Sequence, residues 1–415
     1  MYKFWPASLL ALVTLPALCA ETDAELAARA AALHARIFTI DTHIDVPTAS
    51  LRRSGWDISQ RHDVQTDNSQ CDFPRMREGG LKAGVFAVYL PQGPRTPEGL
   101  AAARDNALRA FLDIHKVAAR FPDLCELAFT AADGPRIQAA GKLAIYLSIE
   151  NGYAIGTDLT LIKTHYGLGA RIFGVTHFSN NDLGDSATDV KGPEWHGLSP
   201  LGRQAVAECN RLGLLLDASH ASDAVLHQLI ALSATPVILS HSDCAAVNPH
   251  PRNVSDDLLR ELAAHGGVIQ MNMLSDYLIP VPPNPAREAA RARIMAKVAG
   301  RELSDNERAA VMKEMHDLAQ QFPGPRATVD DFLKHLFHAI DVVGADHVGI
   351  GADMDGGGGV TGLEDVSGYG QITLALLKHG VSEADVEKIW GGNMLRLLRA
   401  AEDYAAKAKA SPAKS

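Results

Sequence analysis

The sequence predicts an α/β fold in the form of a (β/α)₈ TIM barrel. Eight short runs of apolar and β-branched residues recur along the 415-residue chain, separated by longer stretches with helical periodicity. Such alternation is typical of a parallel sheet covered by helices on both faces. Eight units over this length favour a closed barrel, with an open, doubly wound sheet as the second choice. The runs are RIFTIDTHID, GVFAVYL, LAIYLSIE, RIFGVTHFS, LLLDASH, TPVILSHS, GGVIQMNM and HVGIGADMD.

The largest departure from this regularity is the segment 275–330. The proline-rich stretch IPVPPNP leads there into charged, helical sequence. We expect a helical insertion after strand seven, which could form a lid or a subunit contact, although a solvated helix pair is the plainer reading. The rest of 21–400 reads as one barrel domain, and 401–415 reads as a disordered tail.

The first twenty residues have the pattern of a secretory signal. Lys3 precedes an apolar run from Ala7 to Leu15, and small residues lead to a cleavage site near Ala20. We therefore expect an exported protein, periplasmic or secreted, without a stable membrane anchor. Export permits disulfides, but the sequence cannot decide between buried thiols and one or two disulfides among Cys71, Cys125, Cys209 and Cys244.

The charge balance argues against some partners. The formal net charge is −10, and no cluster or stripe of Lys and Arg stands out. Nucleic acid and anionic membrane surfaces are therefore not expected as partners.

Imidazoles and carboxylates recur at the carboxyl ends of six of the eight predicted strands. In a closed barrel these ends converge on the face where barrel active sites lie. One histidine at a strand end is more often a capping or core residue, but six coincidences at equivalent positions are hard to explain in that way. The residues are His43 and Asp45, Glu150, His177, His220, His241, and Asp353 with Asp355.

These residue types point to a metal centre. Neutral imidazole and carboxylate oxygen suit Zn²⁺, and also Mn²⁺ or Co²⁺. The set exceeds what one tetrahedral ion uses, so we expect two Zn²⁺ ions that share a bridging carboxylate and produce a bridging hydroxide. The implied chemistry is hydrolysis of an amide or ester.

The motifs resemble the membrane dipeptidase (renal dipeptidase) family, the M19 metallopeptidases of the amidohydrolase superfamily. The matching pieces are IDTHIDVP, SIENGYAIG, GVTHFSNNDLGD, LLDASHASD, VILSHSDCAAVNPHPRNVSDDLLR, HVGIGADMDG and IWGGNMLRLL, in the family's order between about residues 38 and 398. Where the family often has aromatic residues, this chain carries Met273 and Leu274.

The resemblance implies a role for each site residue. It implies that His43 and Asp45 bind one zinc, that His220 and His241 bind the other, and that Glu150 bridges them. His177 would stabilise the oxyanion, Arg252 would bind the free carboxylate of the substrate, and Asp353 would carry a proton from water to the leaving amine.

Several nearby polar residues receive lesser roles. Asp41 faces the same way as His43, so we expect it to orient a ligand. Asp355 ranks below Asp353, as a supporting or turn residue. His196 and His250 could line the pocket, whereas His335 and His338 read as one face of an amphipathic helix.

The resulting hypothesis is an exported binuclear zinc dipeptidase of the metallo-dipeptidase class, acting on small L,L dipeptides with L,D dipeptides as further candidates. One alternative is a related metallohydrolase for a lactone, a β-lactam or an N-acyl amino acid. The other is a non-catalytic, exported metal- or peptide-binding protein. The resemblance also implies a possible homodimer. Side-chain preference and native metal stay open.

Overall fold

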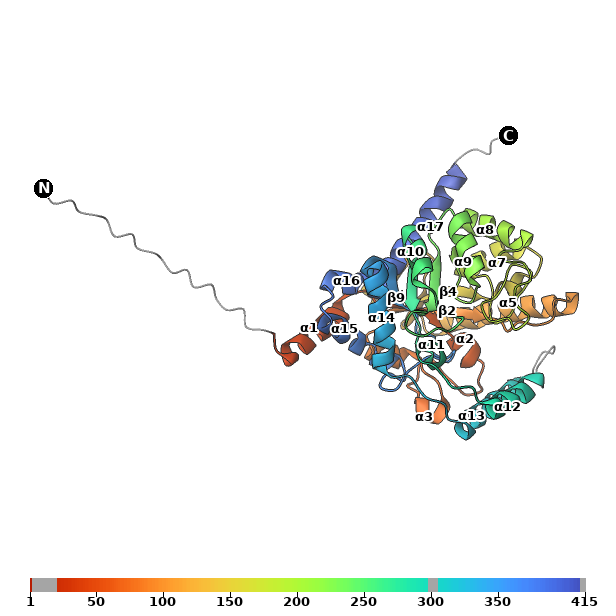
Figure 1. Ribbon diagram of the computed structural model, residues 1–415, viewed down its shortest axis with the longest axis horizontal. Helices are drawn as coiled ribbons and strands as arrows, with labels where there is room; N and C mark the ends of the chain where they lie inside the picture. Colours follow the sequence, from red (N-terminus) through yellow and green to blue (C-terminus); the bar gives the residue numbers. More distant parts are fainter. Residues whose placement is uncertain (2–20, 298–304, 411–415) are drawn as a thin grey trace.

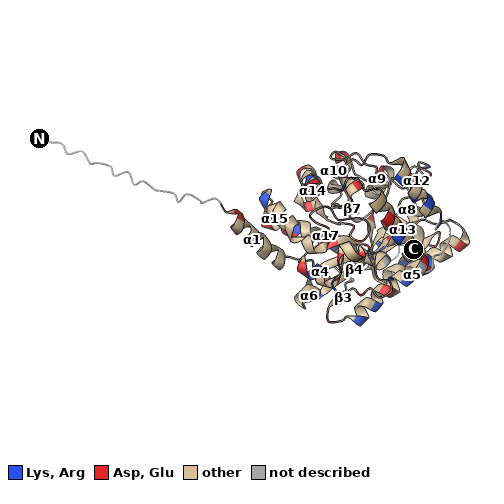
Figure 2. Ribbon diagram, turned by 90° about the horizontal axis from the view of Figure 1, so that it is seen from below, with Lys and Arg blue, Asp and Glu red and all other residues tan. Residues whose placement is uncertain are grey.

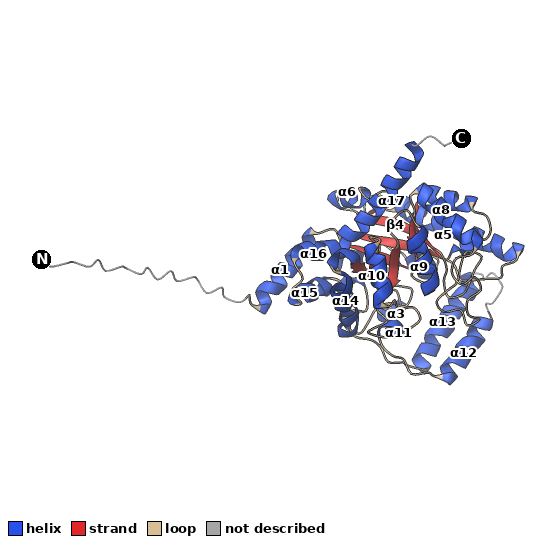
Figure 3. Ribbon diagram, turned by 45° about the horizontal axis from the view of Figure 1, so that its top comes forward, coloured by secondary structure: helices blue, strands red, loops and turns tan. Residues whose placement is uncertain are grey.

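A computed structural model of the protein describes residues 1, 21–297 and 305–410. Figure 3 shows the strands (red) at the centre of the molecule and the helices (blue) around them, as expected of a barrel. The predicted signal segment and residues 411–415 lie outside the described residues. Among the described helices, none has the length and apolar character needed to cross a membrane.

Eight parallel strands follow one another around the barrel, as predicted. Their order is β1-β2-β4-β5-β6-β7-β8-β9, and a short extra strand, β3, pairs with the first residues of β4. A parallel bridge between Ile44 and Met354 brings the two ends of the sheet together. The strands are β1 (Ile40–Ile44), β2 (Ala83–Tyr89), β3 (Cys125–Leu127), β4 (Leu143–Glu150), β5 (Ala170–Gly174), β6 (Leu215–Asp217), β7 (Ile238–Ser242), β8 (Val268–Met271) and β9 (Val348–Ile350).

Helices surround the strands and account for most of the remaining chain (Figure 1). Several begin at a Ser, Thr or Asp side chain that accepts a hydrogen bond from the first turn, as α1 does at Thr22 and α14 at Thr328. The α-helices are α1 (Asp23–Arg36), α2 (Val46–Ala49), α3 (Val64–Asp67), α4 (Phe73–Glu78), α5 (Pro97–Arg120), α6 (Asp133–Ala139), α7 (Thr160–Gly167), α8 (Pro200–Leu212), α9 (Asp223–Leu232), α10 (Asp256–Ala264), α11 (Ser275–Leu278), α12 (Pro285–Ala296), α13 (Asp305–Gln321), α14 (Val329–Val343), α15 (Gly370–Lys378), α16 (Glu383–Glu387) and α17 (Asn393–Ala410).

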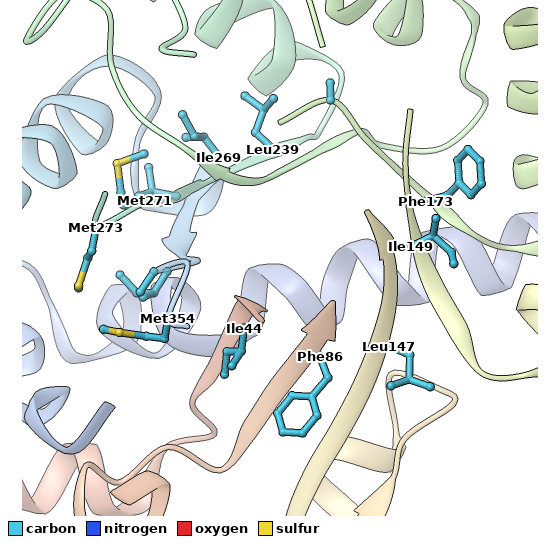
Figure 4. Packing of buried hydrophobic residues seen from close by; sticks show 14 of the residues in the cluster. Ile44, Phe86, Leu147, Ile149, Phe173, Leu239, Ile269, Met271, Met273 and Met354 are labelled. Carbon is cyan, nitrogen blue, oxygen red and sulfur yellow. The ribbon is translucent and has the colours of Figure 1, made fainter. Parts of the chain in front are cut away.

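Successive side chains of a strand point to opposite faces of the sheet, and the buried residues accordingly form two clusters. Inside the barrel, Val85, Tyr146 and Leu215 meet side chains from the other strands, and Leu398 of α17 closes the lower end. The larger cluster lies between the strands and the surrounding helices; Figure 4 shows side chains that successive strands contribute to it. Because Glu150 lies an even number of residues after Tyr146 on β4, it shares the inner face with Tyr146 and reaches the upper end.

The insertion after the seventh barrel strand is helical, as predicted. Helices α12 and α13 pack side by side beside the barrel (Figures 1 and 3). Ile294 of α12 and Leu318 of α13 are buried, whereas most of the other described side chains of this pair are at least partly exposed.

One detail differs from what the sequence suggested. Residues 401–410 are not a disordered tail but the last turns of α17, because Ala401 and Ala405 are buried against the neighbouring structure. The four cysteines at positions 71, 125, 209 and 244 are buried free thiols, which is one of the two alternatives left open. Lys, Arg, Asp and Glu are interspersed over the helices, in keeping with the absence of a basic stripe (Figure 2).

Candidate metal centre and active site

The strand ends bring the predicted site residues together at one end of the barrel. Three overlapping triplets of side chains have ligand atoms within 4.8 Å of one another, and all members are buried. The triplets are His43–Glu150–His241, Glu150–His177–His220 and His43–Asp45–Asp353.

Glu150 lies at the centre of this cluster. Its Oε2 is 3.3 Å from Nε2 of His43, and its Oε1 is 3.1 Å from Nε2 of His220 and 3.4 Å from Nε2 of His177. Nε2 of His241 lies 3.8 Å from the same Oε1 and 2.8 Å from Nε2 of His220. One oxygen of the carboxylate thus faces the imidazole of His43, and the other faces the imidazoles of His177, His220 and His241.

The donor set fits metal ions. Two ligand atoms about 2.0–2.1 Å from a tetrahedral ion are about 3.3 Å apart, close to the distance between Nε2 of His43 and Oδ2 of Asp45, 3.4 Å. Nε2 of His43 and Oδ1 of Asp45 are buried without a hydrogen-bond partner. Buried polar atoms are costly unless something satisfies them, so a cation at this position explains their arrangement.

The pKa shifts of His177 and His220 agree with that interpretation. Burial, followed by the charge of Arg252, lowers the pKa of His177 and of His220 well below the ordinary value. These imidazoles are therefore neutral, the form that binds metal. For His43, burial opposes the charged form, but Glu150 and Asp45 raise its pKa well above the ordinary value.

The same burial raises the pKa of the carboxyl groups. Burial and then Glu150 raise the pKa of Asp45, and burial raises the pKa of Asp353 to about 7. Several acids are thus crowded in a site from which water is largely excluded, and added positive charge would favour their ionised forms.

A hydrogen-bonded chain that the sequence analysis missed orients His241. Nδ1 of His241 is 2.9 Å from Oγ of Ser240, which donates to Oδ2 of Asp217 at 2.5 Å. Asp217 also accepts hydrogen bonds from the backbone N–H and hydroxyl of Ser219. With Nδ1 held as a donor, Nε2 is left as the metal-facing atom. The signal available in the sequence was Asp217, a carboxylate that ends the apolar run LLLD.

Asp41 has the orienting position expected of it. Its carboxylate accepts hydrogen bonds from the backbone N–H of His43, the backbone N–H of Ala352 and the hydroxyl of Tyr369. Asp41 therefore ties the end of β1, which carries His43, to the end of β9, which leads to Asp353.

Arg252 lies beside the cluster and is 2 % exposed. Its guanidinium donates to the backbone carbonyl of His241 at 3.1 Å and lies 5.0 Å from the ring centre of Tyr277. Nε of Arg252 is buried without a partner. A buried guanidinium with free donor capacity can bind a carboxylate.

The two aspartates after β9 have different surroundings. Asp353 faces Asp45 and His43 in the cluster and has the left-handed φ of 61°. Asp355 turns away, since its Oδ1 accepts from the backbone N–H of Gln70 at 2.9 Å. This agrees with its lower rank as a turn residue.

The glycines after these aspartates are closely packed. A Cβ added to Gly356 would lie 2.1 Å from Oδ1 of Asp353 and 2.2 Å from Oδ2 of Asp45, and one on Gly358 would lie 1.9 Å from the carbonyl of Ala352. The requirement for glycine at these positions is not visible in the sequence, because a glycine run reads as a loop unless the neighbouring carboxylates are known.

The remaining histidines divide as follows. His250 lines the pocket above the cluster, whereas His196 is exposed and is not among the lining residues. His335 and His338 lie on the amphipathic helix α14, as predicted: His335 is fully buried, and His338 contacts Asp256 at 2.8 Å.

Barrel and cluster together define a hydrolase with a candidate metal centre at the carboxyl ends of its strands. The chain belongs to the membrane dipeptidase family (peptidase family M19), whose model matches residues 27–412. The resemblance inferred from the motifs is thereby confirmed.

Curated relatives include two fungal dipeptidases. Dipeptidase tcpJ of Claviceps purpurea is 33% identical over 344 residues, which cover 81% of this chain and 71% of that protein. Dipeptidase verJ of Clonostachys rogersoniana is 30% identical over 391 residues, which cover 92% of this chain and 88% of that protein.

Solved structures of similar proteins share the fold. The probable dipeptidase PvdM from Pseudomonas aeruginosa has a TM-score of 0.79 and 29% identity, covering 92% of this chain and all (100%) of that one. A metallopeptidase from Rhodobacter sphaeroides, liganded with a phosphinate mimic of the dipeptide L-Ala-D-Ala, has a TM-score of 0.69 and 25% identity, covering 88% of this chain and 99% of that one. These likenesses confirm the predicted barrel.

Proposed function

We propose that this protein is an exported binuclear zinc dipeptidase that hydrolyses small dipeptides, L,L and L,D. The observation that carries the proposal is the position of Glu150, whose two carboxylate oxygens face His43 on one side and His220 on the other. A carboxylate with His43 and Asp45 on one side and His220 and His241 on the other is an arrangement that suits a pair of metal ions.

The ligand assignment follows from this position. His43 and Asp45 would hold one ion, His220 and His241 the other, and Glu150 would contact both. Asp353 and His177 also lie in the candidate triplets, but we assign each of them a different role in the reaction. When bound, two zinc ions would polarise the scissile carbonyl and lower the pKa of a water molecule.

The chain's own residues supply the other requirements of the reaction. Neutral His177 can donate a hydrogen bond to the carbonyl oxygen as negative charge develops there. Asp353, which faces Asp45 and His43 in the cluster, can accept a proton from water and return it to the leaving amine. Arg252 would bind the terminal carboxylate and so limit substrates to short peptides.

The test is a panel of L,L and L,D dipeptides, assayed with the metal content measured on the same sample. We expect hydrolysis that is lost on chelation and in Glu150→Gln. Glu208→Gln is the matched control, because Glu208 lies on α8 and pairs with Arg211 rather than with a residue of the cluster. Full activity in Glu150→Gln would overturn the site assignment.

The same panel separates the alternatives. A protein that cleaves lactones, β-lactams or N-acyl amino acids and no dipeptide would be a related metallohydrolase. Stoichiometric binding of dipeptides in calorimetry, with no product formed, would indicate a binding protein instead. A proton carrier such as Asp353 favours turnover, because binding alone does not require one.

Export and a homodimeric state belong to the proposal as well. The leader in residues 1–20 supports export, and the family resemblance supports the dimer. Amino-terminal sequencing of the mature protein from a periplasmic or extracellular fraction tests the first, and sedimentation velocity tests the second. A mature chain that begins at Met1 would contradict cleavage near Ala20.

A further inference from the structure

A pocket of about 860 Å³ opens above the metal centre. Gly356 forms part of its wall, and a Cβ at this position would touch the carboxylates of Asp45 and Asp353. Phe178 forms another part, with its ring 4.0 Å from that of His177. A substrate bound at the cluster would therefore extend into this pocket.

Helix α12 contributes two arginines to the same pocket. Arg287 and Arg291 are four residues apart, so they lie on one face of the helix, and both line the pocket. The charge of Arg291 also reaches the buried residue Tyr89. Burial raises the pKa of Tyr89, and the positive charge of Arg291 opposes that rise. The ring of Tyr89 is 4.7 Å from that of His177, so this positive charge is felt next to the predicted oxyanion site.

Neither arginine forms an ion pair with another described residue. None of the ion pairs found among the described residues involves Arg287 or Arg291, although Asp276 and Glu288 line the same pocket. Two guanidinium groups that face a pocket without carboxylate partners can bind an anionic ligand.

A charge account of the substrate indicates which anion this is. A simple dipeptide carries one ammonium group and one carboxylate. Arg252 is already assigned to the carboxylate, and Asp276 or Glu288 can face the ammonium. The other acid can offset one arginine of α12, so one positive charge exceeds what a neutral side chain needs, and it fits a second carboxylate.

We propose that Arg287 and Arg291 select dipeptides with an acidic side chain, aspartate or glutamate. This inference rests on the proposed dipeptidase function and names the substrate class of the same site. The charged helical insertion is then a specificity element above the barrel, rather than only a solvated helix pair.

The test compares matched substrates that differ by one charge. The ratio of kcat/KM for Ala-Glu over Ala-Gln, and for Glu-Ala over Gln-Ala, is measured for the native chain, for Arg291→Gln and for Arg287→Gln combined with Arg291→Gln. The ratio is the readout because it cancels any general loss of activity. Arg293→Gln is the matched control, since Arg293 lies on α12 but not in the pocket wall.

We expect the native enzyme to prefer the acidic member of at least one pair by about five- to tenfold, as for one charge-assisted hydrogen bond. The preference should fall toward one in the double variant, weaken at high salt and persist in Arg293→Gln. An equal rate for acidic and amide substrates, or a preference that survives in the double variant, would overturn the inference. Failure to cleave any dipeptide, Ala-Ala included, would instead overturn the proposed function.

Discussion

Gly356→Ala is expected to damage the metal centre without otherwise changing the fold. The added Cβ would lie 2.1 Å from Oδ1 of Asp353 and 2.2 Å from Oδ2 of Asp45, whereas real Cβ atoms essentially never come within 3.0 Å of another atom. Both carboxylates must therefore move by about 0.8–0.9 Å. Gly356 does not have a left-handed φ, so alanine brings no backbone strain of its own and the effect comes from this contact.

The magnitude follows from the size of that displacement. A misplacement of about 1 Å in a reacting constellation can lower the rate about 100-fold, which corresponds to about 2.7 kcal/mol of transition-state stabilisation. Displaced ligands also bind metal more weakly, by about 10- to 100-fold when they lose their proper support. We expect kcat/KM on a dipeptide to fall about 100-fold and the variant to lose metal in dilute chelator sooner.

The assay combines steady-state kinetics, metal analysis and thermal unfolding. Gly370→Ala is the control, since a Cβ there meets nothing within 4 Å and the residue begins α15. The unfolding midpoint of the chelated Gly356→Ala protein should match that of the chelated native chain. Kinetics and metal content within twofold of the native enzyme in a folded variant would refute the reasoning.

Three further predictions follow from the contacts around the site and from one buried histidine elsewhere. Arg252→Gln should lower kcat/KM on a dipeptide about 100-fold, as expected for loss of a charge-assisted pair worth about 3 kcal/mol, yet leave the rate on the corresponding dipeptide amide nearly unchanged; equal losses on both substrates would contradict carboxylate binding. Ser240→Ala breaks the contact with Nδ1 of His241 and should weaken metal binding about 10- to 100-fold, measured by competition with a chelator; native affinity would show that the chain has no orienting role. For His335, burial lowers the pKa to about 4. Between about pH 6.5 and pH 4 this histidine therefore takes up a proton in the unfolded chain but not in the folded chain. The folded state loses stability as the pH falls through this range. Denaturant titrations at pH 7 and 4.5 should show the native chain losing about 2–3 kcal/mol more than His335→Gln, and equal losses would mean that His335 does not contribute.

The fold and the gathering of the site could be predicted from the sequence for one physical reason. Parallel strands in a barrel all end on the same face, so His43, Glu150 and His241, at the ends of three of the strands, must converge whatever the loops do. The period of two along β4 likewise places Glu150 on the inner face.

Other features depend on three-dimensional proximity that no local pattern records. The contact of Ser240 with Asp217, and the need for glycine at position 356, arise between segments far apart in the chain. The last turns of α17 were misread because an Ala- and Lys-rich end looks unanchored until the partners of Ala401 are known. Similarly, spacing cannot tell that Arg291 lines a pocket, since an exposed helix has the same composition.

The metal requirement is the central claim, and a titration tests it most directly. Metal-free protein is prepared by chelation and dialysis, and dipeptide hydrolysis is followed as Zn²⁺ is added in measured equivalents. With Glu150 between two groups of ligands, we predict that activity rises to a break at two equivalents, and that Glu150→Gln stays inactive over the same range. Full activity before any metal is added, or a break at one equivalent with no further gain, would contradict the binuclear centre.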